Sequence, residues 1–434
     1  MKINPFIAGN RVYPDQFVNR KSEINNAVSL ILTGQSFAFV GDPRSGKTSL
    51  LLYLQAPEIK SELYGKEANR LVFFYQDLQS IPDDVTAAQY WNQALQLMID
   101  TVAKKTPKSL LMTSYRHCAS KEFSTSTLEP LFIQAQKEGW HLILLLDEFD
   151  TLLQHPVLNS TEFYGGLRTL ATRYGNAISI VLSSRQTISE INEKTQTQAR
   201  SGSPFLNFLK EFPVLPFPRA HAHTILNQSG RRFSIQEKEY LLDIAGHHAY
   251  FLQVSGSALW DAYENGYPPQ ERLVFTGREA LRSASVTLER IWQHWTPDTR
   301  KAFTIIAIDE MPTLLGINNF DTETLRESLL ILPRELRYLR ERGIIMEDKQ
   351  LPSGYCVTAK VILWWLAEEL LIALQRKDEL GQLLYLNQWN GLFTKGEQKQ
   401  FSSAISSLGT MAKTGVEVFI KVAAEGFGKG ISGK

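Results

Sequence analysis

Four short apolar runs recur in the first half of the chain, at residues 37–40, 71–75, 141–146 and 178–182. The third run is continuous, which is typical of a central parallel strand buried on both faces. Stretches with helical periodicity separate the runs, and strands that alternate with helices predict a parallel sheet with right-handed crossovers. A further run over 212–216 contains two prolines and predicts a short edge strand, where proline is tolerated.

The periodicity also predicts where the connecting helices lie. Apolar residues at positions 24, 27, 28 and 31 predict an amphipathic helix that Ser22 caps and Gly34 ends. We expect further helices over 84–104 and from Leu128 to Gly139. The Ser-, Thr- and Lys-rich residues 105–127 predict a loop or short helix, and the polar residues 186–204 predict a mobile loop.

The second half of the chain has a different pattern. Residues 220–290 are helical with no strand signal, and 291–372 mix helices with a β-like stretch near 354–358. From these changes we predict four regions. They are a core with an N-terminal arm (1–219), a helical lid domain (220–290), a mixed domain (291–372) and a helical, amphipathic tail (373–434).

Composition adds few constraints. The chain has 434 residues, of which 43% are hydrophobic and 21% charged, as in globular proteins. Its net charge of +1 means that any basic surface must be local. Two cysteines far apart, no apolar signal core at the N-terminus and no run of 18 apolar residues lead us to expect a cytoplasmic protein.

A glycine loop joins the first predicted strand to a helix that continues through Ser49. Its glycines let backbone N–H groups turn toward phosphate oxygens, and the helix start adds its positive dipole end. We expect Lys47 to reach the β- and γ-phosphates and Thr48 to bind Mg²⁺. The alternative is an ordinary strand-to-helix turn, which does not need a buried lysine. The loop reads Gly41, Asp42, Pro43, Arg44, Ser45, Gly46, Lys47 and Thr48.

The strand at 141–146 leads into Asp147 and Glu148. We expect Asp147 to hold the Mg²⁺ shell and Glu148 to orient or deprotonate the attacking water. Alternatively, both acids only cap the next helix. One strand, 71–75, intervenes in the chain between the two motif-bearing strands. This order suggests the class of phosphate-loop proteins in which an extra strand lies between the two motif-bearing strands and a catalytic Glu follows the Asp.

Arg185 lies at the end of the fourth predicted strand. It is either a γ-phosphate sensor or a surface residue in a turn.

Over about residues 5–370 the chain resembles the signal-transduction ATPases with numerous domains, or STAND ATPases. Asn4-Pro5-Phe6 together with 17–20 resembles the family's adenine-side segment, which commonly has Gly where Asn19 stands. The Walker A, Walker B and sensor-strand motifs correspond to 41–48, 144–148 and 182–185. Residues 245–253 resemble the helical-domain motif, with Ala249 where Pro is usual. The ordered set 336–345, 354–355 and 364–366 resembles its winged helix.

The resemblance implies an α/β P-loop NTPase domain with helices on both faces of its sheet, followed by a helical domain and a winged-helix domain over 291–372. It implies ATP, ADP and Mg²⁺ as ligands, and an adenine-side role for Phe17 and Val18. It also implies slow ATP hydrolysis, a closed ADP state, and an open ATP state that self-assembles into a homo-oligomer.

Two other functions stay open. In the first, the same core belongs to a DNA-acting ATPase of the initiator or transposition-helper kind. Arg334, Arg337 and Arg340 recur every three residues on a predicted helix over 333–342, with Leu336 and Leu339 facing inward. In a DNA-binding winged helix this third helix enters the major groove; a solvated or interdomain face is the alternative. The second is a non-hydrolysing scaffold, which the intact Lys47, Asp147 and Glu148 disfavour.

The tail carries charges of alternating sign every four residues, opposite an apolar stripe, which predicts a marginal amphipathic helix. Two interpretations of this tail stay open. In one, it packs on the chain's own predicted winged helix; in the other, residues 403–434 dock onto a protein partner or a membrane surface. The charged row is Lys413, Glu417, Lys421, Glu425 and Lys429, and the stripe is Ala412, Val416, Phe419, Ile420, Ala423 and Phe427.

Overall fold

The computed structural model describes residues 3–7, 9, 12, 17–18, 20–196, 204–315, 322–374, 392–411 and 415–428. The chain forms two compact units. The sheet unit consists of residues 11–42 and 46–214, and the helical unit consists of 1–10, 43–45 and 215–434. The finer division into four regions stays a prediction.

The sheet unit contains a five-stranded parallel sheet with the order β2-β3-β4-β1-β5. Its strands are β1 (Phe37–Val40), β2 (Leu71–Asp77), β3 (His141–Asp147), β4 (Ile178–Ser184) and β5 (Lys210–Pro213). Its α-helices are α1 (Lys21–Leu32), α2 (Lys47–Gln55), α3 (Lys60–Tyr64), α4 (Ala87–Lys105), α5 (Leu111–Ser120), α6 (Thr125–Glu138), α7 (Thr161–Arg173) and α8 (Ile188–Gln196).

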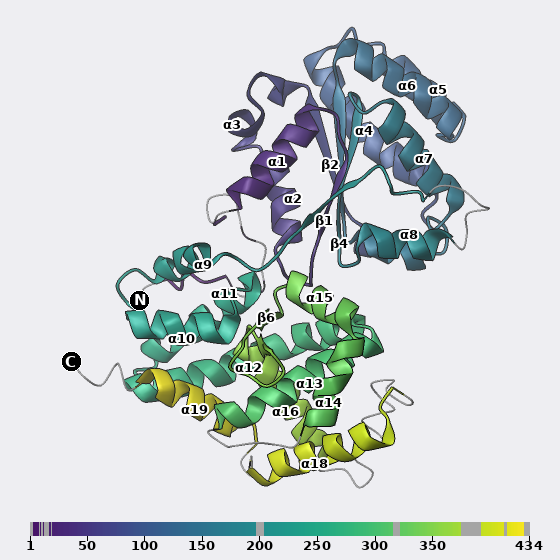
Figure 1. Cartoon of the computed structure of the whole chain (residues 1–434). Coiled ribbons are helices and arrows are strands. Elements are labelled where there is room, and N and C mark those ends of the chain that lie inside the picture. Colours follow the sequence, from purple (N-terminus) through teal and green to yellow (C-terminus); the bar gives the residue numbers. More distant parts are fainter. Residues whose placement is uncertain are drawn as a thin grey trace. The chain divides into compact units, whose positions relative to one another are not determined.

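Helices cover both faces of this sheet, as Figure 1 shows. Ile143 and Leu145 of β3 contact the core beneath α1, α2 and α3. Leu142, Leu144 and Leu146 contact the core beneath helices α4 to α8. Successive side chains of a strand point to opposite faces, so a central strand between two helical layers is apolar on both faces along its middle, as residues 142–146 of β3 are. All seven residues of β3 are buried, including its last residue, Asp147.

All five predicted strands are present, and β5 is an edge strand as predicted, although it spans Lys210–Pro213 and not 212–216 and so contains only the first of the two prolines. An extra strand also separates the two motif-bearing strands β1 and β3. That strand is β4, however, whereas β2, which intervenes in the chain, pairs with the outer side of β3. Because parallel strands pair through long crossovers, their order in the chain does not give their order in the sheet.

Several predicted helix limits and one predicted loop are wrong. Helix α1 starts at Lys21 and not after a Ser22 cap, with Arg20 in a left-handed conformation, although Gly34 ends it as predicted with φ 69°. Helix α6 starts at Thr125, not at Leu128. Residues 188–196, within the predicted loop, form α8. Thr187 and Glu190 cap the start of this helix with reciprocal hydrogen bonds, and the buried side chains of Ile188 and Ile191 hold it against the core. The helix therefore forms although its sequence contains few apolar residues. Residues 197–203 lie outside the described ranges.

The helical unit confirms that 220–290 is helical, although its last helix continues to residue 294. Its first part contains α9 (Arg219–Leu226), α10 (Ile235–Ala245), α11 (Ala249–Glu264) and α12 (Pro269–His294). Its second part contains α13 (Pro297–Leu314), α14 (Glu323–Glu327), α15 (Pro333–Glu341), β6 (Ile345–Glu347), β7 (Tyr355–Val357), α16 (Lys360–Leu374), α18 (Lys395–Met411) and α19 (Glu417–Gly428).

Helices α13, α14 and α15 followed by the antiparallel pair β6–β7 have the order of a winged helix. Two adjacent buried acids of α13 hold the hairpin. Glu310 accepts a hydrogen bond of 2.7 Å from the backbone N–H of Val357 and pairs with Lys360. Asp309 accepts one of 2.7 Å from the backbone N–H of Ser353. Because each buried carboxylate has partners, it joins the hairpin to α13 without leaving a bare charge.

The tail forms two helices, α18 and α19, and the amphipathic helix predicted from the charged row is present as α19, which begins at Glu417. Gly415 has φ 76° just before α19, a conformation that a helix interior does not allow. Phe419 and Ile420 are buried where α19 packs on α10 and α12, and Arg278 of α12 binds Glu417 at 2.6 and 2.9 Å. Its main neighbours are thus α10 and α12, with a smaller contact to α13 of the predicted domain at 291–372. Ala412, Lys413 and Lys429 lie outside the described residues.

Among the helices of the described ranges, none combines the length and the apolar character needed to span a bilayer.

Candidate functional site

The glycine loop connects β1 to α2 through two residues in the left-handed conformation. Gly46 has φ 104° and Arg44 has φ 61°. Glycine reaches such angles without strain, and here it stands directly before the first residue of α2. The turn therefore places the N-terminal end of a helix, with its unpaired backbone N–H groups, at the carboxyl end of β1.

Lys47 lies inside this loop. Its side chain is buried, and its ammonium donates hydrogen bonds to the carbonyl oxygens of Gly41 at 2.9 Å and Asp42 at 3.0 Å. Burial lowers the pKa of Lys47, while the carboxylates of Glu148 and Asp42 act in the opposite direction. An ordinary strand-to-helix turn has no reason to enclose an ammonium, so this burial favours the phosphate-loop interpretation.

Asp147 ends β3 and is held by two hydroxyl groups. Tyr75 of β2 donates a hydrogen bond of 2.8 Å to Oδ2, and Ser183 of β4 donates a short one to Oδ1. The two neighbouring strands thus fix both oxygens of the carboxylate. Tyr75 and Ser183 were not among the predicted site residues, because only the sheet order brings them beside Asp147.

Glu148 stands first in the turn after β3, with φ 52°. It occupies the cap position of the 3₁₀ helix at Phe149–Gln154, yet its side chain makes no capping hydrogen bond. Its Oε2 lies 3.3 Å from Nε of Arg185 instead. The helix-cap alternative therefore does not describe Glu148. Burial raises the pKa of Glu148, and the positive charges of Lys47 and Arg185 oppose that rise.

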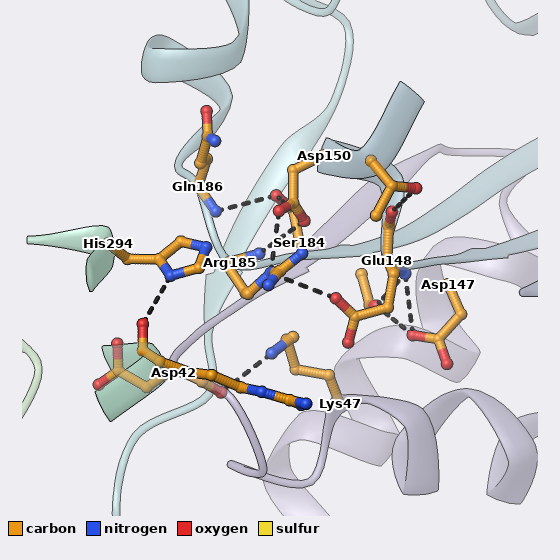
Figure 2. A network of polar contacts seen from close by, with 12 residues as sticks. Asp42, Lys47, Asp147, Glu148, Asp150, Ser184, Arg185, Gln186 and His294 are labelled. Atoms are coloured by element: carbon orange, nitrogen blue, oxygen red, sulfur yellow. Dashed lines mark hydrogen bonds and ion pairs between the residues drawn. The ribbon is translucent and has the colours of Figure 1, made fainter. Parts of the chain in front are cut away.

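Arg185 follows β4 and is shared by two acids. Its Nε lies 3.0 Å from Oδ2 of Asp150 in addition to its contact with Glu148 (Figure 2). Asp150 was missed by the sequence analysis. The available signal was an acid three residues after Asp147 in the same turn, but capping acids are common at that position.

The structure brings together Lys47, Asp147, Glu148 and Arg185 at the carboxyl ends of β1, β3 and β4 (Figure 2). Thr48 and Ser49 lie half-buried in the first turn of α2. Phe17 and Val18 are half-buried, and the Phe17 ring lies 4.5 Å from that of Tyr53 on α2. Phe17 of the N-terminal arm therefore contacts the same helix that starts at the loop.

The other predicted residues lie in the helical unit. Ala249 begins α11, after a turn in which Gly246 has φ 53°. Arg334, Arg337 and Arg340 are exposed on α15.

The model of a protein family described as "Novel STAND NTPase 2" matches residues 23–310. The chain belongs to this family. It is therefore a P-loop ATPase of the STAND type, and it binds and hydrolyses ATP. The matched range contains the glycine loop, Asp147, Glu148, Arg185 and the whole of helices α9 to α12.

No curated protein matches the chain. Among solved structures, it is similar to a Walker-type ATPase of Pyrococcus abyssi, with 17% identity over 83% of this chain and 99% of that one, and a TM-score of 0.48. It is also similar to the ORC2 protein of Aeropyrum pernix in ADPNP–ADP complexes (15% identity, 82% and 94% coverage, TM-score 0.47). A third similar structure is a STAND protein of Pyrococcus horikoshii with a tetratricopeptide repeat sensor. It has 14% identity over 86% of this chain and 47% of that one, and a TM-score of 0.36.

Lys47→Ala should abolish ATP binding or nearly so, because it removes the ammonium that the loop encloses and that we expect to reach two phosphates. Titration calorimetry with ATP measures this directly. Lys66→Ala, which changes an exposed lysine of the same unit, should bind like the parent protein. Unchanged ATP affinity in a folded Lys47→Ala variant would contradict the assignment.

Proposed function

We propose that the protein is an ATP-driven molecular switch, closed with ADP, open and self-assembling with ATP, and reset by slow hydrolysis. The observation that carries this proposal is the ion pair between Arg185 and Glu148. It joins the residue expected to sense the γ-phosphate to the residue expected to activate water. Sensing and hydrolysis then depend on one contact, which suits a switch better than a fast enzyme.

Each residue of the site has a proposed role. Lys47 contacts the β- and γ-phosphates, and the backbone N–H groups of the loop bind phosphate oxygens. Thr48 and Asp147 hold Mg²⁺, for which hydroxyl and carboxylate oxygens are suitable ligands, and Mg²⁺ would neutralise charge on the phosphates. Tyr75 and Ser183 orient the Asp147 carboxylate for this contact. Phe17 and Val18 lie on the adenine side.

Glu148 is the proposed general base or water-orienting group. A base works best when its pKa is near the working pH, and burial moves the pKa of Glu148 in that direction. Arg185, released from Glu148, would contact the γ-phosphate. The pairing seen here therefore corresponds to a restrained site, in which the proposed base is engaged by its neighbour.

Glu148→Gln should preserve ATP binding and lower the hydrolysis rate by roughly 10²- to 10⁴-fold, since it removes the basic carboxylate but keeps the size of the side chain. Mass photometry should show assemblies that persist with ATP and are absent with ADP. Glu67→Gln, an exposed change in the same unit, should behave like the parent protein. Hydrolysis at the parental rate by the Glu148→Gln variant would refute the role of Glu148.

The second candidate function is a DNA-acting ATPase, because the three arginines of α15 are exposed on the third helix of the winged helix while Leu339 is buried beneath them. One observation weakens it: Nη1 of Arg340 pairs with Glu347 of β6 at 2.6 Å. A pairing of this kind reduces the positive charge that the helix presents to a phosphate backbone.

Replacing Arg334, Arg337 and Arg340 together by Ala separates the two candidates. If the protein acts on DNA, the parent protein should bind duplex in a salt-dependent way. The variant should lose this binding, and the slope of log K against log salt concentration should fall by up to about three. If the protein is only a switch, neither the parent protein nor the variant should bind duplex. Replacing Arg231, Arg282 and Arg290, which are also exposed in the helical unit, removes the same charge and serves as the matched control. Fluorescence anisotropy over a salt series measures all three proteins.

We further propose that the tail docks onto a protein partner or a membrane surface when ATP opens the switch. The apolar side chains of α19 are buried against α10 and α12, so docking through them requires their release. With Glu148→Gln holding the ATP state, amides of α19 should exchange faster than with ADP, whereas those of α16 should not change. Equal protection of α19 in both states, without partner or lipid, would refute the release.

A further inference from the structure

Asp150 and Glu148 compete for one guanidinium group. Nε of Arg185 lies 3.0 Å from Oδ2 of Asp150 and 3.3 Å from Oε2 of Glu148. Figure 2 shows the arginine side chain between the two carboxylates, which come from the same turn after β3. A single N–H cannot make a strong, direct hydrogen bond to both acids at once, so a gain for one is a loss for the other.

The two acids differ in how firmly they are held. The Asp150 side chain is 3% exposed and that of Glu148 is 27% exposed. Asp150 also accepts hydrogen bonds from the backbone N–H of Arg185 at 3.1 Å and from the Ser184 hydroxyl at 3.3 Å. The Ser184 hydroxyl in turn accepts one from the backbone N–H of Gln186 at 3.0 Å. Asp150 is therefore fixed to the strand end that carries Arg185.

These differences make Asp150 the anchor of the guanidinium and Glu148 its exchangeable partner. If Asp150 were neutral, the guanidinium would still lie beside the carboxylate of Glu148. Electrostatic attraction at such distances is strong where water is largely excluded, and a carboxylate held by a guanidinium is a weaker base. The buried aspartate would thus keep its neighbour available for catalysis.

We propose that Asp150 is a positioning residue that holds Arg185 away from full engagement with Glu148, and so sets how readily Glu148 acts on the attacking water. This inference rests on the proposed function, in which Glu148 is the base and Arg185 senses the γ-phosphate. Asp150 acts through Arg185 and does not itself touch the nucleotide. Its effect must therefore depend on the presence of Arg185.

A double-mutant cycle tests this dependence. Asp150→Asn keeps the shape of the side chain and removes its charge; it should lower kcat about tenfold, while KM for ATP changes less than about twofold. Arg185→Gln alone should weaken the discrimination between ATP and ADP. In the Arg185→Gln background, adding Asp150→Asn should change kcat by less than about twofold, because no guanidinium remains to be redistributed.

If Asp150 has only a structural role, the double-mutant cycle gives a different result. Its replacement would then lower kcat by the same factor whether or not Arg185 is present, and that additive outcome overturns the proposal. Asp100→Asn, an exposed change on α4, and Arg116→Gln, an exposed change on α5, form the matched control cycle and should leave kcat unchanged. Circular dichroism melts establish that each variant is folded.

A second variant and the Glu148→Gln measurement complete the test. If Asp150→Asn does not fold, Ser184→Ala takes its place in the same cycle, because it removes one hydrogen bond to Asp150 and keeps both charges. The same rule then applies: dependence on Arg185 supports the proposal and additivity overturns it. If Glu148→Gln hydrolyses ATP at the parental rate, the proposed function fails. An inactive Glu148→Gln variant together with an additive cycle overturns only the role of Asp150.

Discussion

Charge compensation at the carboxyl edge of the sheet is the constraint on which the rest of the site depends. Lys47 is enclosed by its own loop, and Asp147 and Asp150 are almost fully buried. Buried charges of this kind are tolerated only when each has partners of opposite charge or hydrogen-bond donors and acceptors. Carbonyl oxygens surround the lysine, hydroxyl groups hold Asp147, and a guanidinium lies between Asp150 and Glu148. Lys47, Asp147 and Asp150 are thereby each held by partners within the protein.

The sheet makes this compensation possible. Its central strands are buried on both faces, so polar groups gather only where the strands end. Placing β4 between β1 and β3 brings Ser183, Ser184 and Arg185 between the lysine loop and the acids. Preorganised dipoles and charges of this sort account for much of the rate enhancement in many enzymes.

In the helical unit, compensated buried charges hold a hairpin in place and do not form part of the candidate site. Asp309 and Glu310 of α13 are buried, and both accept hydrogen bonds from backbone N–H groups at the β6–β7 hairpin. These contacts fix the hairpin to its helix. Helix α19 is held differently, by apolar burial together with an exposed pair between Arg278 and Glu417. Exposed pairs contribute little, about 0 to 1 kcal/mol, so α19 depends on its apolar face.

The amino-acid sequence by itself determined the strands, the glycine loop, Lys47, Asp147, Glu148 and Arg185. These features are local, because the apolar runs and the motif spacings are complete within a few residues. Only the tertiary structure decided that β4 lies between β1 and β3, that Tyr75 and Ser183 orient Asp147, and that Asp150 shares Arg185 with Glu148. It also decided that α8 is a helix and that α19 packs on α10 and α12. The physical reason is that partners far apart in the chain are chosen by strand pairing and burial, which no local pattern records.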